Sequence, residues 1–225
     1  MGSFRRRSVR NETPGACARH VALLLLFALL LPASAFPAAG SAGTWTAVQG
    51  RVGVTTAGAA APWPARTGDP IAVGDLLEAS SDARAQLLLA DDTVVHLSSG
   101  SAIRLLQYAF DPASGRRTAV VKVIDGKARF IVAARKNSRF NVESTQAAIA
   151  ADAADFVALV SPGETTVVVL DGSARVKNIS SLIVAEVELW ANQSSGVRAK
   201  SAPSYPAQIT QQQRKAYRND ARLVR

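Results

Sequence analysis

Cysteine, histidine and aromatic residues are scarce in this chain of 225 residues. A single Cys excludes a disulfide framework and any metal site built from several thiolates. Two His exclude a histidine-rich metal site and leave little material for a catalytic dyad. Because only 6% of the residues are aromatic, a hydrophobic core has to consist mainly of Val, Leu, Ile and Ala. We therefore expect no metal and no cofactor.

Positive charge is in excess, but only at the two ends of the chain. The net charge is +9, yet residues 36–199 contain 15 basic and 15 acidic residues. A nucleic-acid-binding protein is expected to carry its positive charge on the folded face that meets phosphate. The neutral body therefore argues against a nucleic-acid partner.

The N-terminal charge has its own explanation. The basic segment Arg5–Arg7 precedes an apolar run, Val21–Leu31, which is followed by Pro32 and then by Ala33 and Ala35 in an A-x-A cleavage pattern. Eleven apolar residues are too few for a spanning helix, which needs about 20. This pattern predicts a signal peptide over residues 1–35, with an uncleaved anchor as the open alternative. The expected location is periplasmic or secreted, with membrane contact only through the signal peptide.

The remaining chain is predicted to be all-β. Residues 36–44 are small and rich in Pro and Gly, which is typical of a linker. Residues 45–199 contain about a dozen short segments rich in Val, Ile, Leu and Thr, separated by turn residues and without a long amphipathic helix. An antiparallel β-sandwich or β-roll is expected. Residues 200–225 are basic and show a helical spacing of apolar residues over Gln208–Arg225, which predicts a short C-terminal helix.

Four dipeptides indicate where the chain turns. Pro162-Gly163 occupies the central positions of a type II turn, of which the second needs positive φ. Asp125-Gly126 and Asp171-Gly172 are typical of hairpins, and Asp91-Asp92 is a weaker version. The two Asp-Gly pairs also lie in similar segments, which read V-[I/L]-D-G-x-A-R 46 residues apart. We favour ordinary strand corners as the reason, with a pseudo-repeated roll in which each Gly marks a corner as the alternative.

The order of these elements resembles that of the FecR-like domain family over about 150 residues, Val48–Val197. No single motif is specific, but the motifs follow one another in the order that the family has. The matching segments are Gly50–Val52, Gly68–Leu77, Ala83–Leu89, Asp91–Thr93, Ser101–Arg104, Asp125–Arg129, Phe140–Thr145, Val167–Val176 and Val187–Val197.

The chain departs from the family at two positions, one of which is Asp91-Asp92 in place of the family's Asp-Gly turn. Where the family has Arg-Gly-Thr before a strand, this chain has Asp152-Ala153-Ala154 before Phe156. In the regulators that give the family its name, this domain is a periplasmic receiver linked to a cytoplasmic anti-sigma segment. The resemblance would imply the same arrangement here. Here only about twenty residues precede the apolar run, too few for a folded segment. We therefore expect an exported, stand-alone version of the domain.

Candidate catalytic residues do not form a coherent set. His96 lies in a β-rich segment, but the sequence does not identify a residue that would orient it as a general base, and no Ser has a G-x-S-x-G context. Asp91-Asp92 and the pair Asp152 and Asp155 are explained by turns and solvated loops rather than by glycosidase chemistry. We expect that the protein is not an enzyme.

Binding residues are therefore sought among the basic side chains. The cluster Arg135-Lys136-Asn137-Ser138-Arg139 has the pattern of a solvated hairpin loop. The alternative is that it contacts an anionic partner, such as lipid headgroup phosphate or an acidic protein patch. The predicted helix adds three more candidates at Arg214, Lys215 and Arg218. Of the three Trp residues, Trp190 is expected in the core.

Two hypotheses for function follow. The first is a non-catalytic periplasmic binding or scaffolding module that contacts an envelope protein, including outer-membrane proteins, in signalling or envelope organisation. The alternative is a module that binds envelope glycan, either peptidoglycan or polysaccharide. The alternative needs exposed aromatic residues, and the only supply is Trp45, Trp63, Tyr108 and Tyr205.

Overall fold

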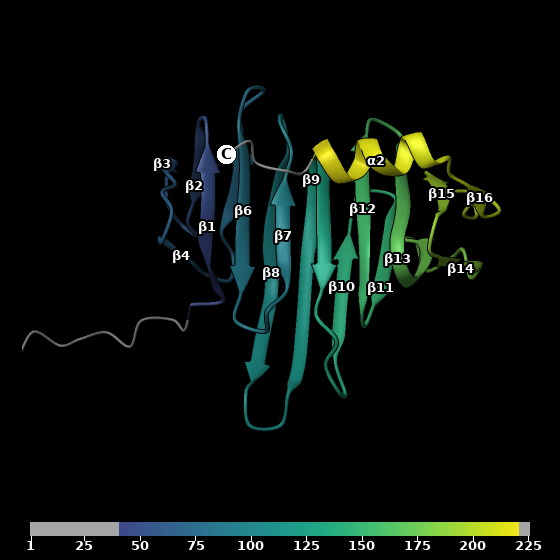
Figure 1. Ribbon diagram of the computed structural model, residues 1–225, viewed down its shortest axis with the longest axis horizontal. Coiled ribbons are helices and arrows are strands. Elements are labelled where there is room, and N and C mark those ends of the chain that lie inside the picture. Colours follow the sequence, from purple (N-terminus) through teal and green to yellow (C-terminus); the bar gives the residue numbers. More distant parts are fainter. Residues whose placement is uncertain (1–40, 221–225) are drawn as a thin grey trace, which may run out of the picture. The chain divides into compact units, whose positions relative to one another are not determined.

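Strands dominate the computed structural model, which describes residues 41–220 (Figure 1). These residues form sixteen strands and one helix, α2 (Gln211–Asp220), and belong to one compact unit. Along β6 (Arg84–Leu89) every second residue is buried, which is the period of a strand with one face on a core. The predicted all-β class with a short C-terminal helix is confirmed. The expected signal-peptide residues, Ala33 and Ala35 among them, lie outside the described part.

Two sheets are formed, here named A and B. Sheet A has the strand order β4–β1–β6–β7–β9–β12–β13–β15–β16. Its strands are β4 (Pro70–Ile71), β1 (Gly43–Gln49), β6, β7 (Val94–Leu97), the second half of β9 (Arg116–Val132), β12 (Ala154–Ser161), the first half of β13 (Glu164–Asn178), β15 (Gln193–Arg198) and β16 (Ala207–Gln208).

Sheet B has the strand order β3–β2–β5–β8–β9–β10–β11–β13–β14. Its strands are β3 (Trp63–Pro64), β2 (Val52–Thr55), β5 (Leu76–Ala79), β8 (Ala102–Asp111), the first half of β9, β10 (Arg139–Glu143), β11 (Ala147–Ala151), the second half of β13 and β14 (Glu186–Trp190). Of the pairings between described strands, only β10 with β9 is parallel. The antiparallel prediction is therefore correct apart from this pair.

Two long strands, β9 and β13, belong to both sheets and bend between them. The bends lie at Gly126 and Gly172, with φ of 75° and 77°. A Cβ at Gly126 would lie 2.7 Å from the Gly100 carbonyl oxygen, and one at Gly172 would lie 2.6 Å from that of Ala153. Only Gly fits both the conformation and the space. The prediction of hairpins at these Asp-Gly pairs is wrong, because each strand continues through the bend. The alternative, that Gly marks the corner in both similar segments, describes the structure.

The other predicted turns keep their expected geometry. Ser161 pairs with Glu164 across the β12–β13 hairpin, and Gly163 has φ of 88°, as a type II turn requires. Asp92 has φ of 64° in the β6–β7 turn, a conformation that Asp tolerates better than most residues.

The core lies between the two sheets. Its centre is three Phe residues, in which Phe130 stacks on Phe156 at 5.2 Å between ring centroids and meets the edge of Phe140 at 6.0 Å. Phe140 is in sheet B and the other two are in sheet A, so the contacts join the sheets. The expectation that Trp190 lies in the core is wrong, since it is 57% exposed. Its neighbour Leu189 takes the inward position on β14, and Trp45 is the fully buried Trp.

A buried ion pair closes one end of the sandwich. The guanidinium of Arg117, at the start of β9, contacts the Asp91 carboxylate in the β6–β7 turn, and both side chains are fully buried. Arg117 also donates to Thr93 Oγ1, Ser138 Oγ and the carbonyl oxygens of Ala133 and Asp152, at 3.0–3.2 Å. One side chain therefore joins the β6–β7 turn to the β9–β10 and β11–β12 connections. Arg117 on β9 therefore binds the Asp152-Ala153-Ala154 segment, through the Asp152 carbonyl oxygen.

The Asp91 carboxylate is held in its charged form. Burial alone would raise its pKa, but hydrogen bonds from Arg117, Thr93 and Tyr108 outweigh burial and lower the pKa below its usual value. The Tyr108 hydroxyl donates to Asp91 Oδ1 at 2.8 Å, and burial together with the nearby carboxylate raises the pKa of Tyr108. Both terminal nitrogens of Arg117 are hydrogen-bonded, whereas its buried Nε has no hydrogen-bond partner in the described part of the chain.

Helix α2 lies on the outer face of sheet A, across β12 and β13 (Figure 1). Thr210 caps its N-terminus, because its hydroxyl accepts from the Gln213 amide and Gln213 Oε1 accepts from the Thr210 amide. Ile209 and Tyr217 pack on a small apolar cluster formed by Val157, Val168 and Leu170. The helix therefore covers part of sheet A, whereas no described helix packs on the outer face of sheet B.

We predict that Asp91→Asn destabilises the fold by about 3–5 kcal/mol at neutral pH, because Arg117 is left buried without a carboxylate. Urea denaturation measures the change. Asp92→Asn is the matched control, since the Asp92 side chain is 75% exposed and Asn also tolerates positive φ. The control should stay within about 0.5 kcal/mol of the parent.

The same pair sets a pH dependence. Unfolded Asp has a pKa of about 3.9, and the folded value of Asp91 lies lower, so ionisation of Asp91 stabilises the fold above pH 4 and less so below it. The stability difference between the parent and Asp91→Asn should therefore shrink as the pH falls below about 4. A difference under about 1 kcal/mol at neutral pH would show that the ion pair does not hold the sandwich together.

We also predict that Gly126→Ala destabilises the fold by about 3 kcal/mol or more, through positive φ and through the clash with Gly100. Gly163→Ala is the control, because Gly163 has positive φ but no atom within 4 Å of the added Cβ. Its expected loss is about 1 kcal/mol in the same urea assay. Equal losses for both variants would contradict the idea that the bend is also limited by space.

Candidate functional site

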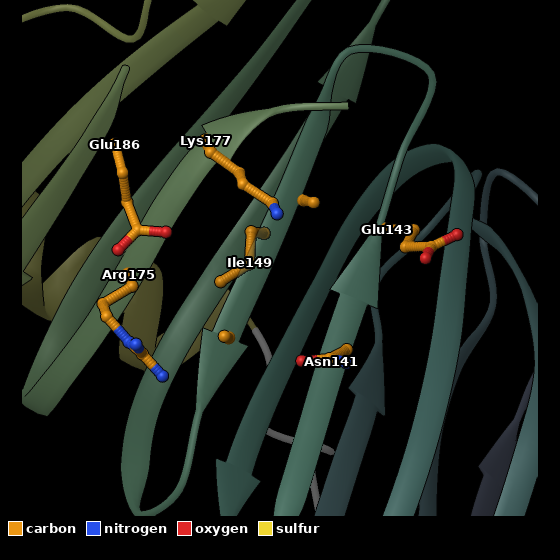
Figure 2. A pocket seen from close by; sticks show the side chains of 8 residues that line it. Asn141, Glu143, Ile149, Arg175, Lys177 and Glu186 are labelled. Atoms are coloured by element: carbon orange, nitrogen blue, oxygen red, sulfur yellow. The ribbon is translucent and has the colours of Figure 1, made fainter. Parts of the chain in front are cut away.

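The outer face of sheet B carries a groove whose floor is β11. The side chains of β11 that point outward are Ala148 and Ala150, which are smaller than all their neighbours. Figure 2 shows Asn141 and Glu143 on one side of this strand, and Arg175, Lys177 and Glu186 on the other. The groove exists because two alanines lie between strands with long polar side chains.

Strand register sets the order of these side chains across the sheet. Ala148 pairs with Glu143 on β10 and with Lys177 on β13, and Lys177 pairs in turn with Glu186 on β14. One step further along the strands, the order is Asn141, Ala150, Arg175 and Glu188. Cations therefore form one wall of the groove, Asn141 and Glu143 form the other, and Glu186 and Glu188 lie beyond the cationic wall.

The groove continues in both directions along the strands. Its central hollow has a volume of about 280 Å³. A second hollow of about 340 Å³ shares Ala150 and Arg175 with it and extends to Asp152 and Ser173. A third, of about 330 Å³, shares Lys177 and Glu186 and extends to the β13–β14 loop. Such an elongated, open shape fits a length of extended chain better than a compact small molecule.

The charges of the groove are not neutralised within the described part of the chain. No carboxylate of residues 41–220 lies within 4.0 Å of the Arg175 or Lys177 nitrogens. By contrast, Arg117, Arg129 and Arg135 each pair with a carboxylate. The two cations of the groove are therefore available to a ligand.

The basic loop predicted from the sequence has a different form. It is the connection from β9 in sheet A to β10 in sheet B, not a hairpin, because β10 runs parallel to β9. Arg135 pairs with Asp92 and lies 5.7 Å from the centre of the Phe110 ring, while Lys136 is exposed. Arg139 is exposed at the start of β10, on the same side of the strand as Asn141. Only Arg139 of the three thus lies near the groove.

The three basic residues predicted on the helix lie on the other sheet. Arg214 donates to the Leu170 carbonyl oxygen at 3.1 Å. Arg129 binds both oxygens of Asp155 and also donates to the Arg218 carbonyl oxygen at 3.4 Å, which fastens the end of α2. Lys215 is exposed. The structure therefore separates the six predicted basic residues onto two surfaces.

Residues Arg175, Lys177, Glu143, Glu186 and Glu188 were missed by the sequence analysis. Their signal was present in part, since Arg175 and Lys177, and likewise Glu186 and Glu188, are charged residues two positions apart in segments with strand character. Alternation alone does not say which strands become neighbours, so the signal was not sufficient.

Other candidate groups are occupied or dispersed. Within residues 41–220, no three His, Cys, Asp or Glu side chains gather to hold a metal ion. Nor does this range contain a helix long and apolar enough to span a bilayer. His96 is buried in β7, and the carboxylates of Asp91 and Asp155 are paired with arginines.

The four aromatic residues expected for glycan binding do not form a shared binding platform on the described surface. Trp45 is 1% exposed, and the Tyr108 hydroxyl is bound to Asp91. Trp63 is half-buried against the core, so Tyr205, at 92%, is the one fully exposed candidate of the four expected for glycan binding. The structure therefore does not bring these four residues together on one surface.

Comparisons with known proteins agree with the fold. Residues 75–175 match the family described as FecR protein. No curated protein matches the chain at a significant level. Two crystal structures of a candidate anti-sigma factor from Parabacteroides distasonis are similar, at 22% sequence identity and TM-scores of 0.49 and 0.50. Each alignment covers 63% of this chain and 63% of the other protein.

At this identity the structural likeness shows the fold alone, whereas the family match rests on the sequence itself. The matched residues lie within the range 45–199 expected from the sequence, and they include β9, β10, β11 and β12. They also include Glu143, Ala148 and Arg175 of the groove. The chain therefore contains a FecR domain.

Proposed function

We propose that this protein is a non-catalytic binding module of the cell envelope, which acts in signalling or envelope organisation by contacting another protein. The single observation that carries this proposal is the groove on the outer face of sheet B. It combines a floor of small side chains with free charges of both signs. An extended protein segment offers both signs of charge and a matching shape.

The FecR domain supports a role in signalling. FecR domains and related anti-sigma proteins are generally non-catalytic. The similar crystal structures are those of a candidate anti-sigma factor, but this chain covers only 63% of that protein. We therefore do not extend a sigma-factor contact to this chain. Its partner in the proposal is an envelope protein, of which outer-membrane proteins are one class.

Location in the periplasm or outside the cell is part of the proposal. It is supported by the expected signal peptide at residues 1–35, whose pattern of basic, apolar and small residues is typical of export. The one Cys precedes the apolar run, so cleavage would leave an exported chain without cysteine. Such a chain would fold in an oxidising compartment without disulfides.

A protein partner is favoured over a glycan by the side chains that line the groove. Sugar rings are bound by stacking on exposed aromatic faces, and the residues lining the three hollows include none. The charged walls instead suit salt-dependent contact with a partner of complementary charge.

The test is crosslinking in cells of the tagged protein, followed by mass spectrometry of the captured proteins. We expect one reproducible envelope protein, and we expect Arg175→Glu with Lys177→Glu to reduce its capture about tenfold or more. The control is Lys136→Glu with Lys215→Glu, which reverses two exposed charges away from the groove and should leave capture unchanged. Because all four positions lie at the surface, stability should change by less than about 0.5 kcal/mol per residue.

Three outcomes would overturn the proposal. Capture that survives the groove variant would move the interface elsewhere, and equal loss in the control would reduce the effect to net charge. If no protein is captured and the purified protein sediments with cell-wall material, glycan binding replaces protein binding.

A further inference from the structure

The strand β14 is an open edge next to the groove. It is the last strand of sheet B and pairs, among described strands, only with β13. The other terminal strands of the two sheets, β3, β4 and β16, have two residues each, and β3 and β4 include Pro64 and Pro70. Short strands and prolines are ordinary protections of a sheet edge. With five residues and no Pro, β14 lacks both protections.

The direction of the backbone groups on β14 follows from two hydrogen bonds. The Ile179 amide donates to Gln146 on the side of β11, so by alternation the amides of Val176 and Ala174 point toward β14. Their partners there are Val187 and Leu189. The Trp190 amide, which by the same alternation faces away from β13, donates to the side chain of Gln193.

Alternation then fixes the remaining residues of this strand. The backbone amides and carbonyls of Glu186 and Glu188 face away from β13. No residue in the described range binds them. The edge of β14 therefore offers a row of free main-chain donors and acceptors.

The side chains around this edge give it a chemical character. Glu186 and Glu188 point to the outer face beside the groove, while Leu189 points to the core. The β13–β14 loop at the Glu186 end carries Leu182 and Val184, each 90% exposed. The edge is therefore acidic on the outer face and apolar at one end.

We propose that a partner protein adds an extended strand to β14, antiparallel to it, with basic side chains at every second position facing Glu186 and Glu188. This inference rests on the proposed function, because the strand is the part of the envelope partner that lies next to the groove. Main-chain hydrogen bonds supply affinity in such strand addition, and alternate side chains supply specificity. The apolar loop residues Leu182 and Val184 cover the end of the added strand.

Charge argues against a second copy of this chain as the occupant. Antiparallel pairing of two β14 strands centred on Glu188 puts the two Glu188 side chains opposite one another. Centred on Val187, the pairing puts Glu186 opposite Glu188 twice. Like charges directly opposite each other destabilise a strand pair, so the occupant has to bring basic residues.

A peptide probe tests the strand addition directly. The probe is a capped peptide that alternates Lys with Val, added at millimolar concentration to the purified isotope-labelled protein. We expect shifted amide resonances at Glu186 and Glu188, and slower hydrogen exchange at these two amides. The Lys residues face Glu186 and Glu188 in hydrogen-bonded pairs, so their amides point toward β14.

N-methylation separates edge pairing from simple charge attraction. Methyl groups on the Lys amides should weaken binding about tenfold or more, because they remove the hydrogen bonds to β14. The matched control carries methyl groups on the Val amides, which point away, and should bind like the parent peptide. A second test changes Glu188 to Lys, which should abolish binding of the Lys peptide while leaving the amide spectrum of the fold intact.

Unchanged Glu186 and Glu188 amides at millimolar peptide would overturn the inference, as would equal binding of the two methylated peptides. Either result leaves the proposed function untouched if the captured partner still depends on Arg175 and Lys177. Conversely, loss of the groove dependence with intact peptide pairing would remove the proposed function and keep the edge as a bare peptide site.

Discussion

The guanidinium of Arg117 is the point on which this fold depends. It is fully buried, it is paired with Asp91, and it donates to residues from three separate connections. A buried charge of this kind is tolerated only when it is paired and hydrogen-bonded. Each partner segment is therefore fixed in place: the β6–β7 turn, the β9–β10 connection and the β11–β12 connection. The β9–β10 connection leads into β10, which forms one wall of the groove. The β11–β12 connection follows β11, which forms the floor of the groove.

The bends at Gly126 and Gly172 complement this closure. Because β9 and β13 pass from one sheet to the other, the two sheets share strands and cannot slide past one another without breaking backbone hydrogen bonds. The second half of β13 carries Arg175 and Lys177, so the bend at Gly172 places the cationic wall of the groove. Ile209 and Tyr217 hold α2 on part of the outer face of sheet A. The outer face of sheet B has no such cover from a described helix and is open to an interaction.

The fold class was predictable from the sequence because alternation and turn chemistry are local properties. Pro162-Gly163 needs only its own neighbours to form a turn. Asp125-Gly126 was misjudged because positive φ suits both a hairpin and a bent strand, and the choice depends on where the following residues pair. Trp190 was misplaced for a similar reason, since a shift of one residue along β14 exchanges inside and outside.

The candidate site could be predicted less well than the fold. Glu143, Lys177 and Glu186 are far apart in the sequence, and only the register of three strand pairs brings them together. Arg117 gave no sequence signal for burial, because its partners come from connections that pair only in the folded chain. The predicted basic residues were identified as exposed charges, yet the Arg135 and Arg214 side chains contact the protein itself.

The central claim is that the outer face of sheet B is the surface that meets a partner. The most direct measurement replaces Ala148, on the groove floor, with a photo-crosslinking amino acid in living cells, and compares it with the same replacement at the exposed Gln212 of α2. The account predicts a crosslinked envelope protein from position 148 and none from position 212. Crosslinking from position 212 alone, or from neither position, would contradict it.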